Sequence, residues 1–317
     1  MTKRPARVNW RTNFLAIVRY ELIWNIRKKK FLGVLILAFV FATLVLFLSP
    51  ILNYVNKVTT VADPNYVITT GIGIGSIGFF LFALVSVMNS ISGEFESGSI
   101  LPLLTKPVSR TTVYLGKVFA AFLTILGAFV LLIIYIAIGG SIIYGPQNNL
   151  YLLSVTLLGS LLSTLVWMGI VMAIGSVSKN SMLAALLGIG IWLGINIASG
   201  ILAVFPSQAW VLTYAPGNGA MATLGALPAN QTNLGALNST STGTDGIATN
   251  LITYILHPNQ NVTYYKINLQ DRQERVSLLS SEPISTTVSR SIAVAVIYII
   301  VFNLIAWYAL KRAQVAE

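Results

Sequence analysis

Six stretches of the chain are long and apolar enough to cross a lipid bilayer. A membrane-spanning helix needs about 20 consecutive, mostly apolar residues. Only a helix satisfies its backbone hydrogen bonds within a single lipid-exposed segment. The six stretches are residues 31–49, 68–91, 118–139, 151–176, 182–205 and 291–310. The pattern predicts an all-α integral membrane protein with six transmembrane helices.

The residues before the first apolar stretch form a segment of a different kind. Residues 10–30 mix apolar side chains with basic ones, which favours a helix lying in the membrane interface. The apolar arc of that helix is interrupted, because Glu21 and Asn25 fall near Phe14 and Val18. A helical lead-in to the first span is a second interpretation of the same residues.

Between the fifth and sixth spans lies the one large polar segment. It is rich in Asn, Thr, Ser and Gly, and Val262–Leu269 has the pattern of a short strand. Asn230, Asn238 and Asn261 each begin a glycosylation sequon. The expected organisation is an N-terminal helix (1–30), transmembrane helices 1–5 (31–205) with a cytoplasmic loop (92–117), a mixed extracellular insertion (206–288), and helix 6 with its tail (289–317).

Composition and charge agree with a membrane protein and orient it. The chain is 55% hydrophobic and 9% charged, whereas soluble domains carry about 25% charged residues. Nine of its 20 Lys and Arg precede residue 31. With the N-terminus in the cytoplasm, 15 of the 20 lie on the inner side and 5 on the outer. The positive-inside rule therefore predicts a multi-pass cell-membrane protein with both termini cytoplasmic. Sequons outside and no cysteine suggest an archaeal cell membrane.

Several kinds of chemistry are excluded by what the sequence lacks. It has no cysteine, and His257 is the only histidine, so thiolate chemistry and multi-histidine metal sites are excluded. The central parts of the six spans carry no ionisable residue, which disfavours ion-coupled carriers and intramembrane hydrolases. There is no phosphate-binding loop, so ATP hydrolysis is not expected in this chain itself.

Glycines in two of the spans have a packing interpretation. Gly73, Gly75 and Gly78 match a dinucleotide-binding pattern, but they lie in an apolar span without a preceding strand. Close approach of neighbouring helices explains them better, and the same holds for Gly190 and Gly194 in the fifth span.

The loop between the second and third spans has the most specific sequence. It contains Glu94, Glu96 and Gly98, then the apolar residues Ile100, Leu101, Leu103 and Leu104, and then Pro107 and Arg110. A solvated turn joining two spans is one interpretation. The mixture of charged and apolar residues instead favours a short amphipathic helix, ending at Pro107, that docks on a cytoplasmic protein.

This loop closely resembles that of the permease subunits of ABC transporters of the type-two exporter class. The shared pattern is Glu-x-Glu-x-Gly-Ser-Ile, Leu-Leu, a Pro-Val-Ser-Arg turn and a final Gly-Lys, and it runs from Glu94 to Lys117. The layout of the chain also matches that of the family: a basic lead-in, six spans and a basic end. The sequon-bearing insertion is a departure, because compact members of the family lack it.

The resemblance implies a complex rather than a single chain. Two permease copies would pair, most simply as a homodimer through the second and fifth spans. Each copy would sit on a separate ATP-binding subunit that holds ATP and Mg²⁺. Membrane lipid is a further expected partner, and nucleic acid is not.

The resemblance also implies roles for individual residues. Residues 94–106 would form the coupling helix, with Glu94 and Glu96 making polar contacts to the ATPase and Leu103 and Leu104 supplying buried anchors. Arg110 and Lys117 would lie at the lipid headgroups.

Two alternatives to an exporter permease remain. One is a membrane subunit of an ABC complex that transmits force or a signal without carrying cargo, and the other is an ion-coupled carrier.

Overall fold

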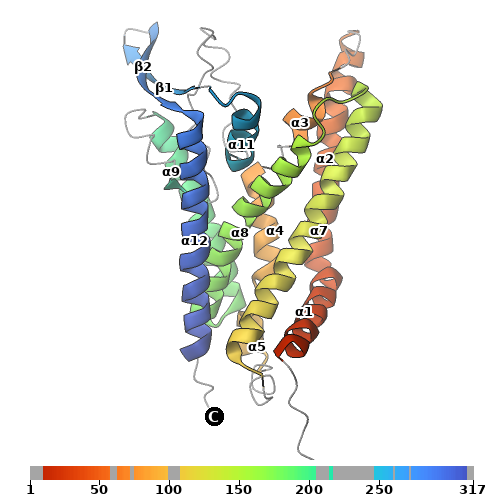
Figure 1. Cartoon of the computed structure of the whole chain (residues 1–317), viewed down its shortest axis with the longest axis vertical. Coiled ribbons are helices and arrows are strands. Elements are labelled where there is room, and N and C mark those ends of the chain that lie inside the picture. The colour runs from red at the N-terminus through yellow and green to blue at the C-terminus, as the bar shows by residue number, and fades with distance from the viewer. Residues whose placement is uncertain are drawn as a thin grey trace, which may run out of the picture.

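The computed structural model describes residues 10–57, 63–71, 75–98, 108–204, 214–216, 246–259, 261–270 and 273–312. The described chain is helical except for one antiparallel pair of strands at one end of the molecule (Figure 1). Its last described helix, α12, ends at the opposite end, where α1 and α5 also lie (Figure 1). The predicted all-α membrane architecture is therefore confirmed in outline.

Five helices of the described chain are long and apolar enough to cross a membrane. They are α2 (Lys29–Val55), α7 (Arg110–Tyr144), α8 (Leu152–Ser178), α9 (Ser181–Val204) and α12 (Ile284–Arg312). Within the second predicted span and just before it, the structure describes α3 (Tyr66–Gly71) and α4 (Gly75–Val87), and residues 72–74 lie outside the described residues.

Some of the helices extend well beyond the predicted spans. The third span was expected to begin at residue 118, but α7 begins at Arg110 and has 35 residues, about 52 Å at 1.5 Å per residue. A hydrocarbon core is about 30 Å thick, so α7 must project from it. Ser109 sets this early start, because its Oγ accepts a hydrogen bond from the Thr112 amide at 3.1 Å.

The N-terminal segment forms a separate helix, α1 (Trp10–Arg27), beside α7. It is separated from α2 by Lys28, whose backbone is extended (φ −62°, ψ 118°). The buried face of α1 carries Val18, Glu21 and Asn25. The interrupted arc is thus explained: this face packs on protein, while aromatic residues such as Trp24 are exposed.

Close packing of α1 on α7 depends on Gly116. A Cβ atom at Gly116 would lie 2.6 Å from Cγ2 of Ile17, closer than real Cβ contacts allow. A larger residue there would push the two helices apart. Gly116 was expected only as part of the family pattern, so its packing role is a finding of the structure.

The main core is built around α8. Its Trp167, Met168 and Met172 are buried together with Phe80 and Phe82 of α4. Phe80 packs edge-on against Trp167, with ring centroids 5.3 Å apart. By contrast, α2 and α9 keep most of their apolar side chains exposed, as expected of helices that face lipid or another subunit.

The end opposite α1 and α5 holds a short apolar helix and the strand pair. Helix α11 (Gly246–Leu256) packs on α8 and α12 (Figure 1). Strand β1 (Asn261–Gln270) contains the strand predicted at Val262–Leu269. It pairs antiparallel with β2 (Gln273–Pro283), which runs directly into α12. The sixth helix therefore starts at residue 284, seven residues earlier than the apolar run indicated.

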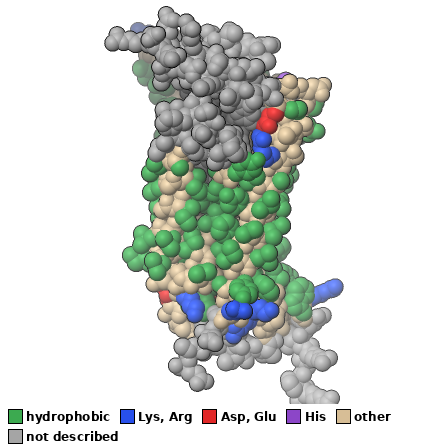
Figure 2. All heavy atoms as spheres, turned by 90° about the vertical axis from the view of Figure 1, so that its left-hand side faces the viewer, with side chains coloured by type: hydrophobic (Ala, Val, Ile, Leu, Met, Phe, Trp, Pro, Cys, Tyr) green, Lys and Arg blue, Asp and Glu red, His purple; other side chains and the backbone are tan. Residues whose placement is uncertain are grey.

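The surface separates into zones along the long axis. Figure 2 shows a broad band of apolar side chains across the middle of the molecule, with Lys and Arg gathered below it. An apolar band bordered by charge is typical of a protein that crosses a bilayer.

Candidate functional site

The loop with the specific sequence begins with a short helix, α5 (Ser92–Glu96), directly after α4. At its start, Ser92 Oγ donates a hydrogen bond to the Met88 carbonyl at 2.6 Å, which links α5 to the residues that follow α4. Gly98 follows with φ +68°, a left-handed conformation that glycine adopts without strain. The helix therefore ends at a defined turn.

Glu96 fastens α5 to the beginning of α9. Its carboxylate accepts a hydrogen bond from the Ser181 amide at 2.8 Å and a second, short one from the Ser181 hydroxyl. Ser181 is the first residue of α9, and negative charge at a helix N-terminus is favourable. These hydrogen bonds hold the pKa of the Glu96 carboxyl below its usual range.

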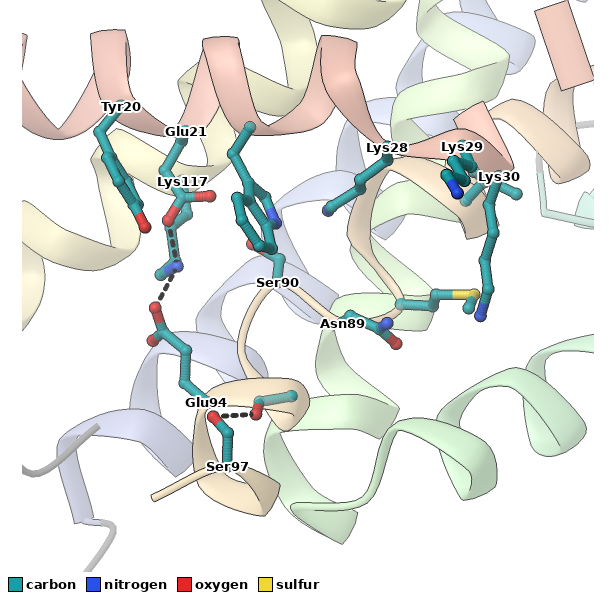
Figure 3. A pocket seen from close by; sticks show the side chains of 14 residues that line it. Tyr20, Glu21, Lys28, Lys29, Lys30, Asn89, Ser90, Glu94, Ser97 and Lys117 are labelled. Atoms are coloured by element: carbon teal, nitrogen blue, oxygen red, sulfur yellow. Dashed lines mark hydrogen bonds and ion pairs between the residues drawn. The ribbon is translucent and has the colours of Figure 1, made fainter. Parts of the chain in front are cut away.

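Glu94 belongs to a buried ion cluster that joins three elements. Lys117 Nζ of α7 lies 2.8 Å from Glu94 Oε1 of α5 and 2.5 Å from Glu21 Oε1 of α1. Figure 3 shows Lys117 between the two carboxylates. We call Glu21, Glu94 and Lys117 the ion cluster. The side chains of Lys117, Glu21 and Glu94 are only 3%, 8% and 22% exposed.

Burial makes the three charges of the ion cluster depend on one another. A buried charge is costly unless an opposite charge and hydrogen bonds compensate it. Burial raises the pKa of the Glu94 carboxyl, and the Lys117 ammonium opposes this shift. Because Lys117 is shared by two carboxylates, loss of Lys117 would leave both without their partner.

Lys117 is buried between two carboxylates, so the expectation that its side chain contacts the lipid headgroups was wrong. Its side chain points inward because α1 covers this part of α7 and supplies Glu21. The signal in the sequence was the interrupted arc of the N-terminal helix, since a carboxylate on a buried face calls for a cationic partner. The partner is 96 residues away, which local patterns cannot reveal.

Arg110 connects the start of α7 to the end of α12. Its Nη1 donates a hydrogen bond to the Lys311 carbonyl at 2.8 Å. A cation at a helix C-terminus is favourable. Nearby, the Tyr114 hydroxyl donates to Asn303 Oδ1 at 2.7 Å. The early part of α7 thus contacts α1, α5 and α12.

The remaining predicted site residues fall into two groups. Asn261 is described, exposed and the first residue of β1. Outside the described residues lie Ile100, Leu103, Leu104, Pro107, Asn230 and Asn238. The structure therefore brings Glu94 and Glu96 into defined contacts and leaves the apolar half of the expected coupling helix a prediction.

The arrangement links α5 to three other helices. Among the described residues, no group of three or more His, Asp or Glu side chains could hold a metal ion. What the site offers is a short helix tied by charge and hydrogen bonds to α1, α7 and α9. A displacement of α5 would act on all three.

Comparison with known proteins assigns the family. No curated protein matches the chain. The profile of the family described as ABC-2 family transporter protein matches residues 15–315, nearly the whole length, and the match includes most of α1, the ion cluster and α12. The helical membrane architecture and the family profile agree, and the chain therefore belongs to the ABC-2 transporter family.

Proposed function

We propose that the chain is the permease subunit of an ATP-driven exporter and that a separate subunit binds ATP and Mg²⁺. Membership of the ABC-2 family supports a membrane transport component. The loop between the second and third spans, residues 94–106, is the proposed contact with the ATP-binding subunit. The observation that carries this proposal is the attachment of α5 to α1, α7 and α9.

In this mechanism, the ion cluster transmits movement of the loop to the membrane helices. ATP can shift the permease only if the ATP-bound partner favours one arrangement of the helices over the other. Glu94 and Glu96 bind Lys117 and Ser181 within this chain. We therefore assign them the role of fastening the loop, and assign docking to the apolar residues that follow.

The experiment for this proposal is the double substitution Leu103→Asp/Leu104→Asp. Apolar anchors at the centre of an interface each contribute about 2 kcal/mol or more, so two buried charges should weaken association at least 100-fold. The tagged chain is purified gently from its native membrane, and the companion carrying a phosphate-binding loop is quantified. The wild type should yield it in stoichiometric amount and the variant almost none.

A matched control places the same charges at the other end of the molecule. Asn148→Asp/Asn149→Asp adds two carboxylates at exposed positions in the turn between α7 and α8. This variant should keep the companion. Purification of the intact wild-type chain without any ATP-binding companion would contradict the proposed function.

The topology is proposed from the distribution of charge. The end that holds α1, α5 and the end of α12 is the basic end, and we assign it to the cytoplasm. Strands β1 and β2 then lie outside the cell, with the sequons at Asn230, Asn238 and Asn261. We propose that these asparagines carry glycans and that the membrane is an archaeal cell membrane.

A homodimer is proposed through α9, with α4 beside it. The apolar face of α9 is largely exposed in the single chain. A Cβ atom added at Gly190 or Gly194 would meet no atom within 4 Å. These glycines therefore do not serve close packing inside the chain, and a second copy is the partner that would use them.

Filling both glycine positions should break the dimer. Gly190→Leu/Gly194→Leu adds two bulky side chains at the proposed interface, and overpacking costs about 1–3 kcal/mol per site. Dimerisation, measured by light scattering in detergent, should weaken at least tenfold. The matched control Gly33→Leu/Gly127→Leu fills two open glycines on α2 and α7 and should remain dimeric. Equal weakening in both variants would argue against this interface.

A further inference from the structure

A cavity of about 640 Å³ lies at the basic end, between α1 and the junction of α4 with α5. Pockets that bind small molecules typically measure about 300–1,000 Å³. Its lining includes Glu21, Glu94 and Lys117, so the ion cluster forms one wall. Figure 3 shows the cluster at one side of the cavity and Lys28, Lys29 and Lys30 at the other.

The three lysines give the cavity an excess of positive charge. Both carboxylates that line it, Glu21 and Glu94, are already bound to Lys117. Within the described chain, no carboxylate lies within ion-pair distance of Lys28, Lys29 or Lys30. The lining therefore carries four cations against two anions, and an anion would complement it.

Lys28 contributes to the excess of positive charge in the cavity lining. Its Nζ donates a hydrogen bond to Asn25 Oδ1 at 2.7 Å. Burial lowers the pKa of Lys28 to about 8; the charges of Lys117 and Lys30 add to this shift, and Glu21 opposes it. A bound anion would relieve the cost of holding this ammonium group away from water.

Another part of the lining is apolar and aromatic. It comprises Tyr20 and Trp24 of α1 with Val85 and Met88 near the end of α4. Trp24 and Tyr20 are 57% and 67% exposed, and such aromatic residues are enriched at membrane interfaces. Since Lys29 begins the first spanning helix, the cavity opens at the level where lipid headgroups lie.

We propose that this cavity binds an anionic phospholipid, with its phosphate among Lys28, Lys29 and Lys30 and its acyl chains along Trp24, Val85 and Met88. Charge complementarity selects the anion. The apolar wall at the membrane surface selects a lipid over a soluble phosphate compound, which would leave that wall unused. The inference needs the chain to cross a membrane and is independent of the ATP-binding partner.

The test compares two double substitutions that remove the same charge from the same end of the molecule. Lys29→Gln/Lys30→Gln alters the cavity at two exposed positions, and Arg11→Gln/Arg19→Gln alters exposed residues outside its lining. The full chain in detergent is mixed with phosphatidylglycerol or with phosphatidylcholine of the same acyl chains. Native mass spectrometry counts the lipids retained by each protein.

The expected result is preferential retention of phosphatidylglycerol by the wild type and by the arginine variant. The lysine variant should retain about tenfold less phosphatidylglycerol than the wild type, because each lysine near an anionic headgroup adds electrostatic attraction. Equal loss of phosphatidylglycerol from both variants would overturn the proposal, because it would indicate diffuse attraction to the basic end. Equal retention of phosphatidylglycerol and phosphatidylcholine by the wild type would also overturn it. So would displacement of phosphatidylglycerol by glycerol 3-phosphate, which would indicate a soluble phosphate ligand.

Discussion

Lys117→Met is expected to lower the free energy of unfolding by about 3–5 kcal/mol, which is the cost of removing one partner from a buried ion pair. Lys117 is the only cation within ion-pair distance of Glu21 and Glu94 among the described residues. The substitution would leave two carboxylates in a largely buried position without a counter-charge. Thermal unfolding of the purified chain in detergent measures the loss, and ATPase stimulation in the complex measures the effect on coupling.

Two further variants distinguish the effect of breaking the ion cluster from the general effect of removing a lysine. Lys179→Met removes an exposed cation at the same end and should cost little. The triple variant Glu21→Gln/Glu94→Gln/Lys117→Met removes all three charges, so it should recover much of the stability without restoring the ionic link. Coupling that stays at the wild-type level in the triple variant would show that the ion cluster does not transmit movement.

The apolar runs predicted the spanning helices because every spanning helix must be long enough to cross the hydrocarbon core of the bilayer. That constraint is local, so residues 31–49 and 151–176 could be assigned from the sequence alone. The helix ends could not, because they depend on caps outside the bilayer, such as Ser109 at the start of α7. Residues 68–91 met the apolar criterion as well, and the structure describes α3 and α4 in this stretch, with residues 72–74 outside the described residues.

The candidate site was only partly accessible from the sequence. The pattern from Glu94 to Lys117 located the loop, since it is contiguous in the chain. The contacts that define the site are not contiguous: Glu21 meets Lys117, and Glu96 meets Ser181, 85 residues away. Such pairs follow from helix packing, which local patterns in a single sequence do not reveal. The second strand, β2, was also missed, because few of its residues are apolar.

Gly159→Ala is expected to destabilise the end of the molecule that holds α11 by about 1–3 kcal/mol through overpacking. A Cβ atom at this position in α8 would lie 2.6 Å from Cα and 2.7 Å from the backbone nitrogen of Ala248 in α11. Backbone atoms cannot swing aside as a flexible side chain can, so α11 itself must move. Thermal unfolding, together with protease cleavage around α11, measures the change.

The control for this prediction is the same substitution where no neighbour stands in the way. A Cβ atom at Gly127 of α7 meets nothing within 4 Å, and alanine generally favours a helix over glycine by up to about 1 kcal/mol. Gly127→Ala should therefore be neutral or stabilising, opposite in sign to Gly159→Ala. Equal stability of the two variants would show that α11 is not tightly seated on α8.

The two destabilising substitutions should also affect different steps of the proposed transport cycle. Ala248 is fully buried, and Asn250 of α11 contacts Ser291 of α12, so a shift of α11 acts on the adjacent ends of α8 and α12. The ion cluster lies at the opposite end, with the proposed ATPase contact. Gly159→Ala should therefore leave the ATP-binding companion bound while it lowers transport. Loss of the companion from this variant would mean that the whole fold, rather than the seating of α11, had been disturbed.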